Sequence, residues 1–332
     1  MQFSDRPIFI LGAHKSGTSL LRNLLDGHPE LFAVPIETHF PHCMGLPACY
    51  PRRMQVVPGD RGKAARMMRM LEIVKGYNGS DDKRADNYLP GRFDQSVFTE
   101  HLQRKLTDQG GADDLGHYLD AVMCSLGMAI PEGTRHFVEK SVDNIEHARW
   151  LKQLFPQARF LFIVRHPQAN LVSFRKFIQR NDRFPSLVQP IRTLEFAFHH
   201  AVLYNGTLPD MHLLRYEDLT ADPRKVMEEV AGFLQIKWSE CLLHPTSMGE
   251  SWTGNSTTGR AMQGVSAEHL ERWRSEIEPV ETGLIERSSL SALMPLFGYH
   301  IAPKKGFWRM AKGEGFTTYL RNRIYRIFAD GS

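Results

Sequence analysis

The hydrophobic positions near the start of the chain follow two patterns in succession. A continuous apolar run from Ile8 to Leu11 ends at Gly12, which is typical of a buried strand closed by a tight turn. Beyond Gly17 the apolar residues take helical spacing, at Leu20, Leu21, Leu24 and Leu25. The stretch therefore predicts a buried strand, a glycine turn and a helix.

Strand and helix patterns then alternate along much of the chain. Apolar runs predict further strands at residues 31–34, 136–140, 159–164 and 211–216. Helices are expected after three of them and also over 191–204, and Asp143 or Asn144 is expected to cap the helix that ends near Phe155. This alternation indicates the α/β class, a parallel sheet flanked by helices. Its ligands are expected at the carboxyl ends of the strands, where Gly12, Lys140 and Arg165 fall.

A segment from about residue 40 to 130 interrupts the alternation. Its first twenty residues are rich in Pro, Cys and Arg and predict a loop. Helical spacing returns at 62–75, 93–107 and 115–128. We therefore expect one domain over residues 1–300 with a mostly helical insertion at about 40–130.

The C-terminal part carries a polar loop and a basic tail. Residues 245–265 are rich in Ser, Thr, Gly and Asn and predict a mobile loop, followed by a helix from Ser266 and a second that ends near Leu293. In the tail, 301–332, apolar residues share one helical face with arginines beside them over 316–328. Such a helix contacts a membrane surface or a partner, or packs on its own domain, and the sequence leaves these alternatives open.

Composition narrows the class of protein. The chain has 332 residues, of which 42% are hydrophobic, enough for a normal core, and its net charge of +4 is too mild to indicate nucleic-acid binding. Four scattered cysteines give no disulfide framework, although Cys43 and Cys49 are close enough to pair. A strand begins within about six residues of Met1, and no apolar run is long enough to span a membrane. We therefore expect a cytoplasmic protein.

The glycine turn is suited to binding an anion. The first N–H groups of a helix have no acceptor within it, so they attract phosphate or sulfate. The nearest common pattern is the P-loop, GxxxxGK[ST], but GAHKSGTS places Thr18 where the lysine belongs and puts Lys15 inside the loop. After the strand at 159–164, Arg165 stands where a Walker-type enzyme has an aspartate for magnesium. Both departures favour a nucleotide handled without a metal.

These residues resemble the sulfotransferases that use 3′-phosphoadenosine 5′-phosphosulfate (PAPS). HKSGTSL is similar to their 5′-phosphosulfate loop, and Arg165 followed eight residues later by Ser173 is similar to their 3′-phosphate motif. LLDGHPELF with Glu37-Thr38 most resembles the glycan, protein-tyrosine and bacterial branches. The resemblance implies a P-loop-like parallel sheet and an enzyme of the EC 2.8.2 type. Such an enzyme moves a sulfuryl group from PAPS to a hydroxyl by in-line displacement, releasing adenosine 3′,5′-bisphosphate, with no metal required.

The resemblance also implies a set of site residues. Lys15 and Lys140 are expected to stabilise charge on the transferring group, and Glu37 to act as the base. The donor is expected to contact the loop and its flanks: Lys15, Ser16, Gly17, Thr18, Ser19, Leu20, Arg165, Ser173 and, from the 245–265 loop, Arg260. The segment LLRYEDL closely resembles its family counterpart, where its role is mainly structural, so no chemistry is assigned to it.

The base of this site has more than one candidate. A glutamate with an ordinary pKa near 4.3 is a weak base for an alcohol, so burial would have to raise the pKa or proton transfer would have to come late. The histidine that cytosolic-type sulfotransferases carry after the second lysine is absent, because Ser141 follows Lys140. His14 and His39 are therefore the reserve candidates. Zinc binding by His39, His42, Cys43 and Cys49 fits no familiar spacing.

Two other functions and several acceptors stay open. A P-loop kinase for a small metabolite would bind magnesium and ATP, and a non-enzymatic module would act at a membrane or a partner through the basic tail. Side chains that would suit a sugar, lipid headgroup or phenol lie in the insertion and the polar loop: Tyr77, Tyr88, Arg92, Phe93 and Trp252. A carbohydrate or other alcohol or phenol is the expected acceptor, and no nucleic acid is expected to bind.

Overall fold

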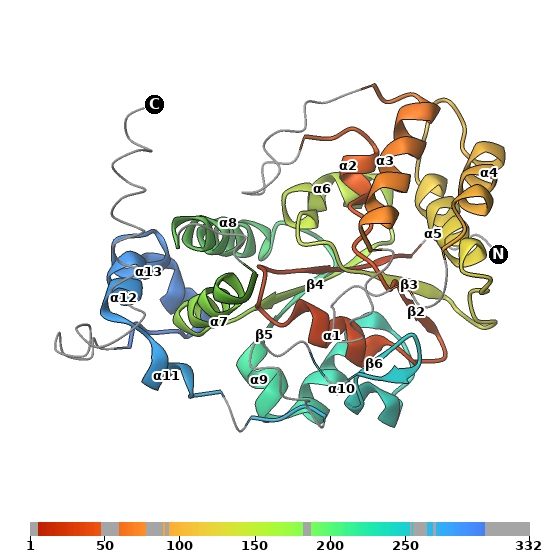
Figure 1. Cartoon of the computed structure of the whole chain (residues 1–332). Helices are drawn as coiled ribbons and strands as arrows, with labels where there is room; N and C mark the ends of the chain where they lie inside the picture. Colours follow the sequence, from red (N-terminus) through yellow and green to blue (C-terminus); the bar gives the residue numbers. More distant parts are fainter. Residues whose placement is uncertain are drawn as a thin grey trace, which may run out of the picture.

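The computed structural model describes residues 6–47, 60–77, 89, 93–181, 187–252, 254, 264–267 and 270–302. Within these ranges five parallel strands form one sheet in the order β2-β3-β1-β4-β5. The strands are β1 (Ile8–Leu11), β2 (Leu31–Ala33), β3 (His136–Glu139), β4 (Arg159–Val164) and β5 (Met211–Arg215). The parallel sheet predicted from the sequence is confirmed, and β1 lies at its centre (Figure 1).

The central strand is buried on both faces, and its side chains alternate between two cores. Phe9 and Leu11 belong to one core, whereas Ile8 and Ile10 belong to the other. None of the four side chains is more than 1% exposed, and burying each one stabilises the fold by roughly 1.5–3 kcal/mol. The continuous apolar run in the sequence therefore corresponds to a strand without a solvent face.

Helices cover both faces of the sheet (Figure 1). On the Ile8 side lie α1 (Thr18–Leu25), α9 (Tyr216–Ala221) and α10 (Pro223–Leu234). On the opposite side lie α6 (Asn144–Leu154) and α8 (Val188–Tyr204), while α7 (Pro167–Asn181) runs on from β4. A short 3-10 helix, Glu240–Leu243, follows α10. Because α8 begins at Val188, the expected start at residue 191 was three residues late.

The described residues between β2 and β3 contain helices and no strand. The helices are α2 (Phe40–Cys43), α3 (Lys63–Tyr77), α4 (Gln95–Lys105) and α5 (Asp113–Ser125). The last three match the predicted spans to within a few residues. The prediction of a loop directly after residue 40 was wrong at α2, which is a single helical turn. Pro41 fits in this first turn because the N–H that proline lacks would have no acceptor within the helix.

The C-terminal part differs most from the prediction. Residues 264–267 are not helical, and the helix expected from Ser266 is only α11 (Trp273–Glu276). It ends where Ile277 becomes extended, and the next helix starts with a capping box between Glu278 and Glu281 and with Pro279 in its first turn. In place of the expected second helix there are two shorter ones, α12 (Pro279–Glu286) and α13 (Leu290–Leu293). A 3-10 helix, Met294–Phe297, follows them.

Part of the predicted polar loop is folded. A two-stranded hairpin forms from β6 (Thr246–Ser247) and β7 (Glu250–Ser251), and the Asp26 carboxylate accepts hydrogen bonds from Thr246 Oγ1 at 2.7 Å and Gly249 N at 2.9 Å. Trp252 follows and packs in the core beside α10 with 5% of its surface exposed. Trp252 is therefore not available as an acceptor contact, contrary to the expectation.

Several sequence predictions fall outside the described residues. They are Cys49, Tyr88, Arg92, Arg260 and the amphipathic stretch at 316–328. Among the described helices, none is both long enough and apolar enough to cross a membrane.

A buried ion pair ties the helices of the insertion together, and we expect it to be sensitive to removal of one partner. Arg66 Nε lies 2.9 Å from Asp114 Oδ2, and the two side chains are 1% and 4% exposed. Asp114→Ala leaves the guanidinium buried without its counterion, so the free energy of unfolding should fall by about 3–5 kcal/mol in denaturant titrations. Glu240→Ala breaks the exposed pair with Arg224 and should change stability far less. Equal losses would contradict this account.

Candidate functional site

The glycine loop has the shape of an anion cradle. Lys15 adopts a left-handed backbone with φ 64°, and Gly17 has φ 105° directly before α1. A Cβ atom on Gly17 would lie 2.4 Å from the Tyr216 ring, so only glycine fits there. The loop therefore delivers the N-terminal N–H groups of α1, which begins with Thr18, Ser19 and Leu20, to the carboxyl edge of the sheet.

Arg165 links this loop to the next strand end. Its Nη1 donates to the Lys15 carbonyl oxygen at 2.9 Å, and its guanidinium carbon lies 4.5 Å from the centre of the Tyr216 ring. The Nε atom of Arg165 is buried and has no hydrogen-bond partner among the described residues. Ser173, the other half of the predicted 3′-phosphate site, is half-buried on α7. The guanidinium thus keeps an unused donor beside the loop, as an anion site requires.

Tyr216 is a site residue that the sequence analysis missed. Its ring fills the space beside Gly17 and lies against the Arg165 guanidinium. It begins α9, directly after β5, within the segment LLRYEDL to which no chemistry was assigned. Its position at the carboxyl end of a parallel strand was the available signal.

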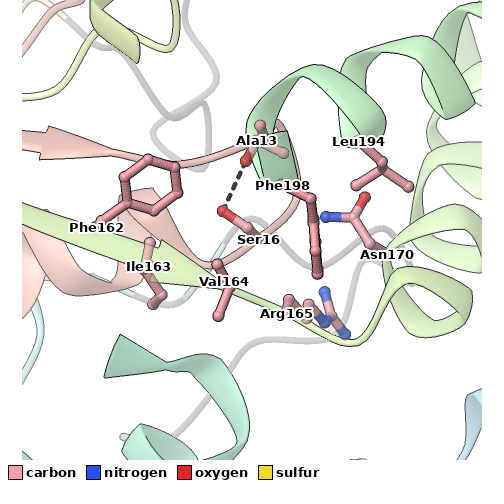
Figure 2. Close-up of a pocket in the computed structure, with 10 residues that line it drawn as sticks. Ala13, Ser16, Phe162, Ile163, Val164, Arg165, Asn170, Leu194 and Phe198 are labelled. Atoms are coloured by element: carbon pink, nitrogen blue, oxygen red, sulfur yellow. Dashed lines mark hydrogen bonds between the residues drawn. The ribbon is translucent and has the colours of Figure 1, made fainter. Parts of the chain in front are cut away.

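A small hollow lies behind the loop (Figure 2). Its empty volume is about 190 Å³, and its walls include Phe162, Leu194 and Phe198 as well as Ser16. Pockets for small molecules usually measure about 300–1,000 Å³. This hollow is therefore packing space between the loop and α8 and not the nucleotide site, although Arg165 forms part of its rim.

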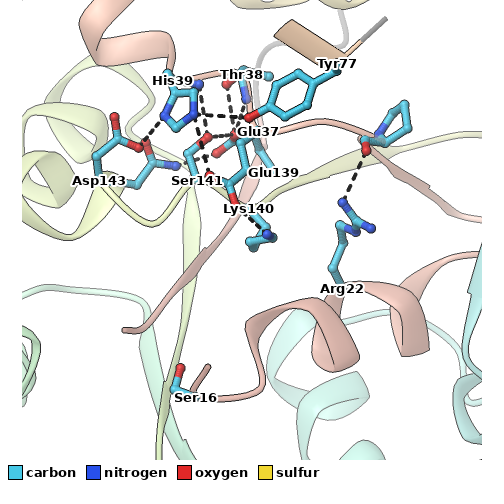
Figure 3. Close-up of polar contacts among 12 residues, drawn as sticks. Ser16, Arg22, Glu37, Thr38, His39, Tyr77, Glu139, Lys140, Ser141 and Asp143 are labelled. Carbon is cyan, nitrogen blue, oxygen red and sulfur yellow. Dashed lines mark hydrogen bonds and ion pairs between the residues drawn. The ribbon is translucent and has the colours of Figure 1, made fainter. Parts of the chain in front are cut away.

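The second centre of the site is a buried pair of opposite charges. Lys140 directly follows β3 and Glu37 follows β2, and these strands are neighbours in the sheet. Lys140 Nζ lies 2.6 Å from Glu37 Oε1, and the two side chains are 2% and 9% exposed (Figure 3). The parallel sheet thus brings together two of the three residues predicted to do the chemistry.

A histidine and an aspartate stand behind the glutamate. His39 Nδ1 lies 2.7 Å from Asp143 Oδ1, and His39 Nε2 lies 3.5 Å from Glu37 Oε2 and 3.3 Å from the Tyr77 hydroxyl (Figure 3). His39 is 2% exposed and has the left-handed φ of 46°. Asp143 occupies the N-cap position of α6 but makes no capping hydrogen bond, because its carboxylate contacts the imidazole. The predicted N-cap position of Asp143 is thus confirmed, but its carboxylate contacts His39 instead of a backbone N–H of the helix.

A second buried carboxylate, Glu139, holds these two strand ends together. It accepts hydrogen bonds from Thr38 N at 3.1 Å, from Thr38 Oγ1 at 2.9 Å, and from the side chains of Ser141 and Asn144. Burial raises the pKa of Glu139, although these neutral donors act in the opposite direction. Glu139 fixes the backbone on either side of the Glu37 and Lys140 pair.

The charge state of Glu37 is set by its neighbours. Burial alone would raise the pKa of its carboxyl group, as the sequence analysis required of a base. The Lys140 ammonium, with smaller contributions from His39 and His14, outweighs burial and lowers that pKa to about 2. Of the two conditions under which Glu37 could act as a base, a pKa raised by burial is not met in this arrangement, because its counterion is buried with it, and late proton transfer is the alternative that stays open.

The structure also bears on metal binding. Among the residues it describes, no group of three or more His, Cys, Asp or Glu side chains is arranged to hold a metal ion. His39 is instead engaged with Asp143 and Glu37, and Cys43 Sγ donates to the Thr38 carbonyl at 3.6 Å. The zinc alternative has no support from these residues.

Comparisons with known sequences agree on one family. A family model described as Sulfotransferase family matches residues 7–240. Protein-tyrosine sulfotransferase 2 of Gallus gallus is 24% identical over 288 residues, which cover 81% of this chain and 63% of that protein. Protein-tyrosine sulfotransferase 1 of Homo sapiens is 24% identical over 291 residues, covering 85% of this chain and 63% of that protein. The chain thus spans somewhat less than two thirds of the length of these relatives.

Two solved structures share the fold. The sulfotransferase domain of the Synechococcus PCC 7002 olefin synthase aligns with a TM-score of 0.52 and 19% identity, covering 91% of this chain and 98% of that domain. The sulfotransferase domain from the curacin biosynthetic pathway aligns with a TM-score of 0.50 and 19% identity, covering 85% and 96%. The arrangement of the parallel sheet and its flanking helices is therefore that of these domains.

The lowered pKa of Glu37 predicts a pH-dependent stability difference. The folded-state pKa of about 2 lies below the ordinary value of 4.5, so the ionised carboxylate stabilises the fold above pH 4.5 and this contribution is lost as pH falls from 4.5 to 2. Glu37→Gln should therefore be less stable than wild type at pH 7, on the order of 3 kcal/mol. The gap should narrow as denaturant titrations move from pH 5 to pH 3. Glu72→Gln, at an exposed position of α3, should show no such trend, and a constant gap for Glu37→Gln would refute the assignment.

Proposed function

Because the chain belongs to the sulfotransferase family, we propose that it transfers a sulfuryl group from PAPS to a hydroxyl acceptor. One observation carries this proposal. The glycine loop, with Lys15 inside it and Arg165 against it, faces the same sheet edge as the buried pair of Lys140 and Glu37. An anion cradle and a proton acceptor thus share one edge, which a transfer between an anionic donor and an alcohol requires.

The residues of the donor side fit PAPS. The N–H groups at the start of α1 and the hydroxyls of Thr18 and Ser19 suit the 5′-phosphosulfate, and the buried, unused Nε of Arg165 suits the 3′-phosphate. The ring of Tyr216 lies against the Arg165 guanidinium, and Ser173 on α7 stays the proposed hydroxyl partner of the 3′-phosphate. PAPS, when bound, supplies a sulfuryl group on a phosphate leaving group. Arg260 stays a proposed contact from outside the described residues.

The acceptor side must remove a proton. In the proposed reaction the acceptor oxygen forms a bond to sulfur, the bond from sulfur to the 5′-phosphate oxygen breaks, and the acceptor proton passes to a Glu37 oxygen. A carboxyl group with a pKa of about 2 is ionised but weakly basic. Because Lys140 causes most of that lowering, turning Lys140 from Glu37 toward the sulfuryl oxygens would both stabilise the charge there and make Glu37 more basic.

The proposed acceptor is a hydroxyl compound that reaches Glu37. Tyr77 reaches the site from the end of α3, whereas Phe93 is buried in the core and offers no acceptor surface. A hydroxyl of a carbohydrate or another alcohol or phenol suits this setting, because proton removal by Glu37 asks only for an O–H group. A phenol belongs to the proposed class because two relatives are named protein-tyrosine sulfotransferases, which supports this acceptor without fixing it for the present chain.

Binding of the product nucleotide tests the donor site. Adenosine 3′,5′-bisphosphate should bind in calorimetry, and adenosine 5′-monophosphate, which lacks the 3′-phosphate, should bind about 10- to 150-fold more weakly, as the loss of charge-assisted hydrogen bonds predicts. Arg165→Met should weaken binding of adenosine 3′,5′-bisphosphate more than binding of adenosine 5′-monophosphate, because only the first ligand carries the 3′-phosphate. Equal binding of both ligands would contradict the proposal, and magnesium-dependent ATP binding would favour the kinase alternative.

Turnover of a Glu37→Gln variant tests the base. General base catalysis contributes about 10²- to 10⁴-fold, so kcat for transfer from PAPS should fall at least about 100-fold. Affinity for adenosine 3′,5′-bisphosphate should stay within about two-fold, because the carboxylate does not contact the donor in this assignment. Glu72→Gln is the matched control and should keep full turnover. Full turnover in Glu37→Gln, with a loss in His39→Gln, would transfer the role of base to His39.

A further inference from the structure

One face of α7 contacts His14 and Lys15 in the glycine loop. Asn170, Phe174 and Phe177 lie at positions i, i+4 and i+7 of this helix, which places them on one face. Asn170 Nδ2 donates to the His14 carbonyl oxygen at 3.0 Å, and the His14 ring meets the Phe174 ring edge-on at 6.1 Å. The same face continues to Phe177.

The ammonium group of Lys15 lies over the ring of Phe177. Lys15 Nζ lies 4.5 Å from the centre of that ring, within the distance of a cation–π contact. The lysine side chain is long and half-exposed, so holding it in one place costs rotamer entropy. The left-handed backbone of Lys15 and the hydrogen bond from Arg165 to its carbonyl oxygen fix the start of the side chain, and Phe177 holds its end.

A neutral aromatic ring and a carboxylate both hold a lysine ammonium, but only the carboxylate neutralises its charge. Lys140 shows the other case, because its ammonium is neutralised by Glu37 at 2.6 Å. A ring face attracts a cation through its quadrupole without adding negative charge, so it neither competes with an anion for the ammonium nor repels an anionic donor. The contact with Phe177 therefore holds the Lys15 ammonium without itself cancelling the positive charge.

We propose that Phe177 is a positioning residue for Lys15, holding the ammonium beside the glycine loop so that it meets the sulfuryl-bearing phosphate of the donor. The role rests on the proposed function. Ser173, one helical turn before Phe177, lies on the same side of α7. A single rigid helix therefore sets the position of the lysine relative to the candidate 3′-phosphate site.

Spectroscopy tests the contact without any enzyme assay. In protein labelled with ¹³C-lysine, the Lys15 methylene protons next to the ammonium should resonate upfield, because they lie over the ring, and loss of the signal in Lys15→Arg identifies it. Phe177→Tyr should keep the upfield shift and Phe177→Leu should abolish it. An unshifted Lys15 signal in wild type would overturn the proposal whether or not the chain is a sulfotransferase.

Kinetics test the role. Phe177→Leu should lower kcat by about two- to five-fold, the value of a half-exposed cation–π contact, and Phe177→Tyr should restore it. In a Lys15→Met background the Phe177→Leu change should have no further effect. Phe233→Leu, a partly buried phenylalanine on α10, is the matched control and should keep full kcat.

Three results would overturn the inference. They are full kcat in Phe177→Leu, an equal loss in Phe177→Tyr, and an undiminished loss in the Lys15→Met background. If Phe177→Leu does not fold, Phe177→Met supplies the same comparison. An absence of turnover in wild type would instead refute the proposed function, and the spectroscopic result would still decide the contact.

Discussion

The parallel pairing of β1 with both β3 and β4 is the constraint on which the site depends. Parallel strands end at the same edge of a sheet, so the residue that follows β1 shares that edge with those that follow β3 and β4, although more than a hundred positions separate it from each of them. Gly12 follows β1, Lys140 follows β3 and Arg165 follows β4. An antiparallel neighbour would have carried one of these groups to the opposite edge. The alternation of apolar runs and helices therefore determines the chemistry as well as the fold.

Two buried carboxylates show how this edge tolerates charge. Glu139 is surrounded by neutral donors from Thr38, Ser141 and Asn144, and its pKa is raised. Glu37 faces an ammonium and its pKa is lowered. Burial is similar for both, so the neighbours decide the difference. One carboxylate holds the backbone in place, and the other keeps a charge that a reaction can use.

Sequence patterns predicted the sheet, most of the helices and the strand-end position of Lys140, because each of these depends on local periodicity or on a strand boundary. They did not predict that His39 would contact Asp143, since the two residues are 104 positions apart and neither belongs to a repeating pattern. Trp252 was misjudged for a related reason: a polar neighbourhood in sequence says little about whether an aromatic side chain packs into a distant core. The pKa of Glu37 needed the position of its counterion, which only the tertiary structure supplies.

The hydrogen bond from Arg165 to the Lys15 carbonyl also has a consequence for how the protein is made. It joins residues 150 positions apart, and the hydrogen bond from Asn170 to the His14 carbonyl joins residues 156 positions apart. During synthesis from the N-terminus, the glycine loop emerges long before the helix that shapes it. Contacts of such long range form late in folding, because the entropy of closing a long loop must be overcome first. A ribosome-bound chain that stops before α7 therefore lacks an organised anion site, and nucleotide binding would report that α7 has docked on the glycine loop.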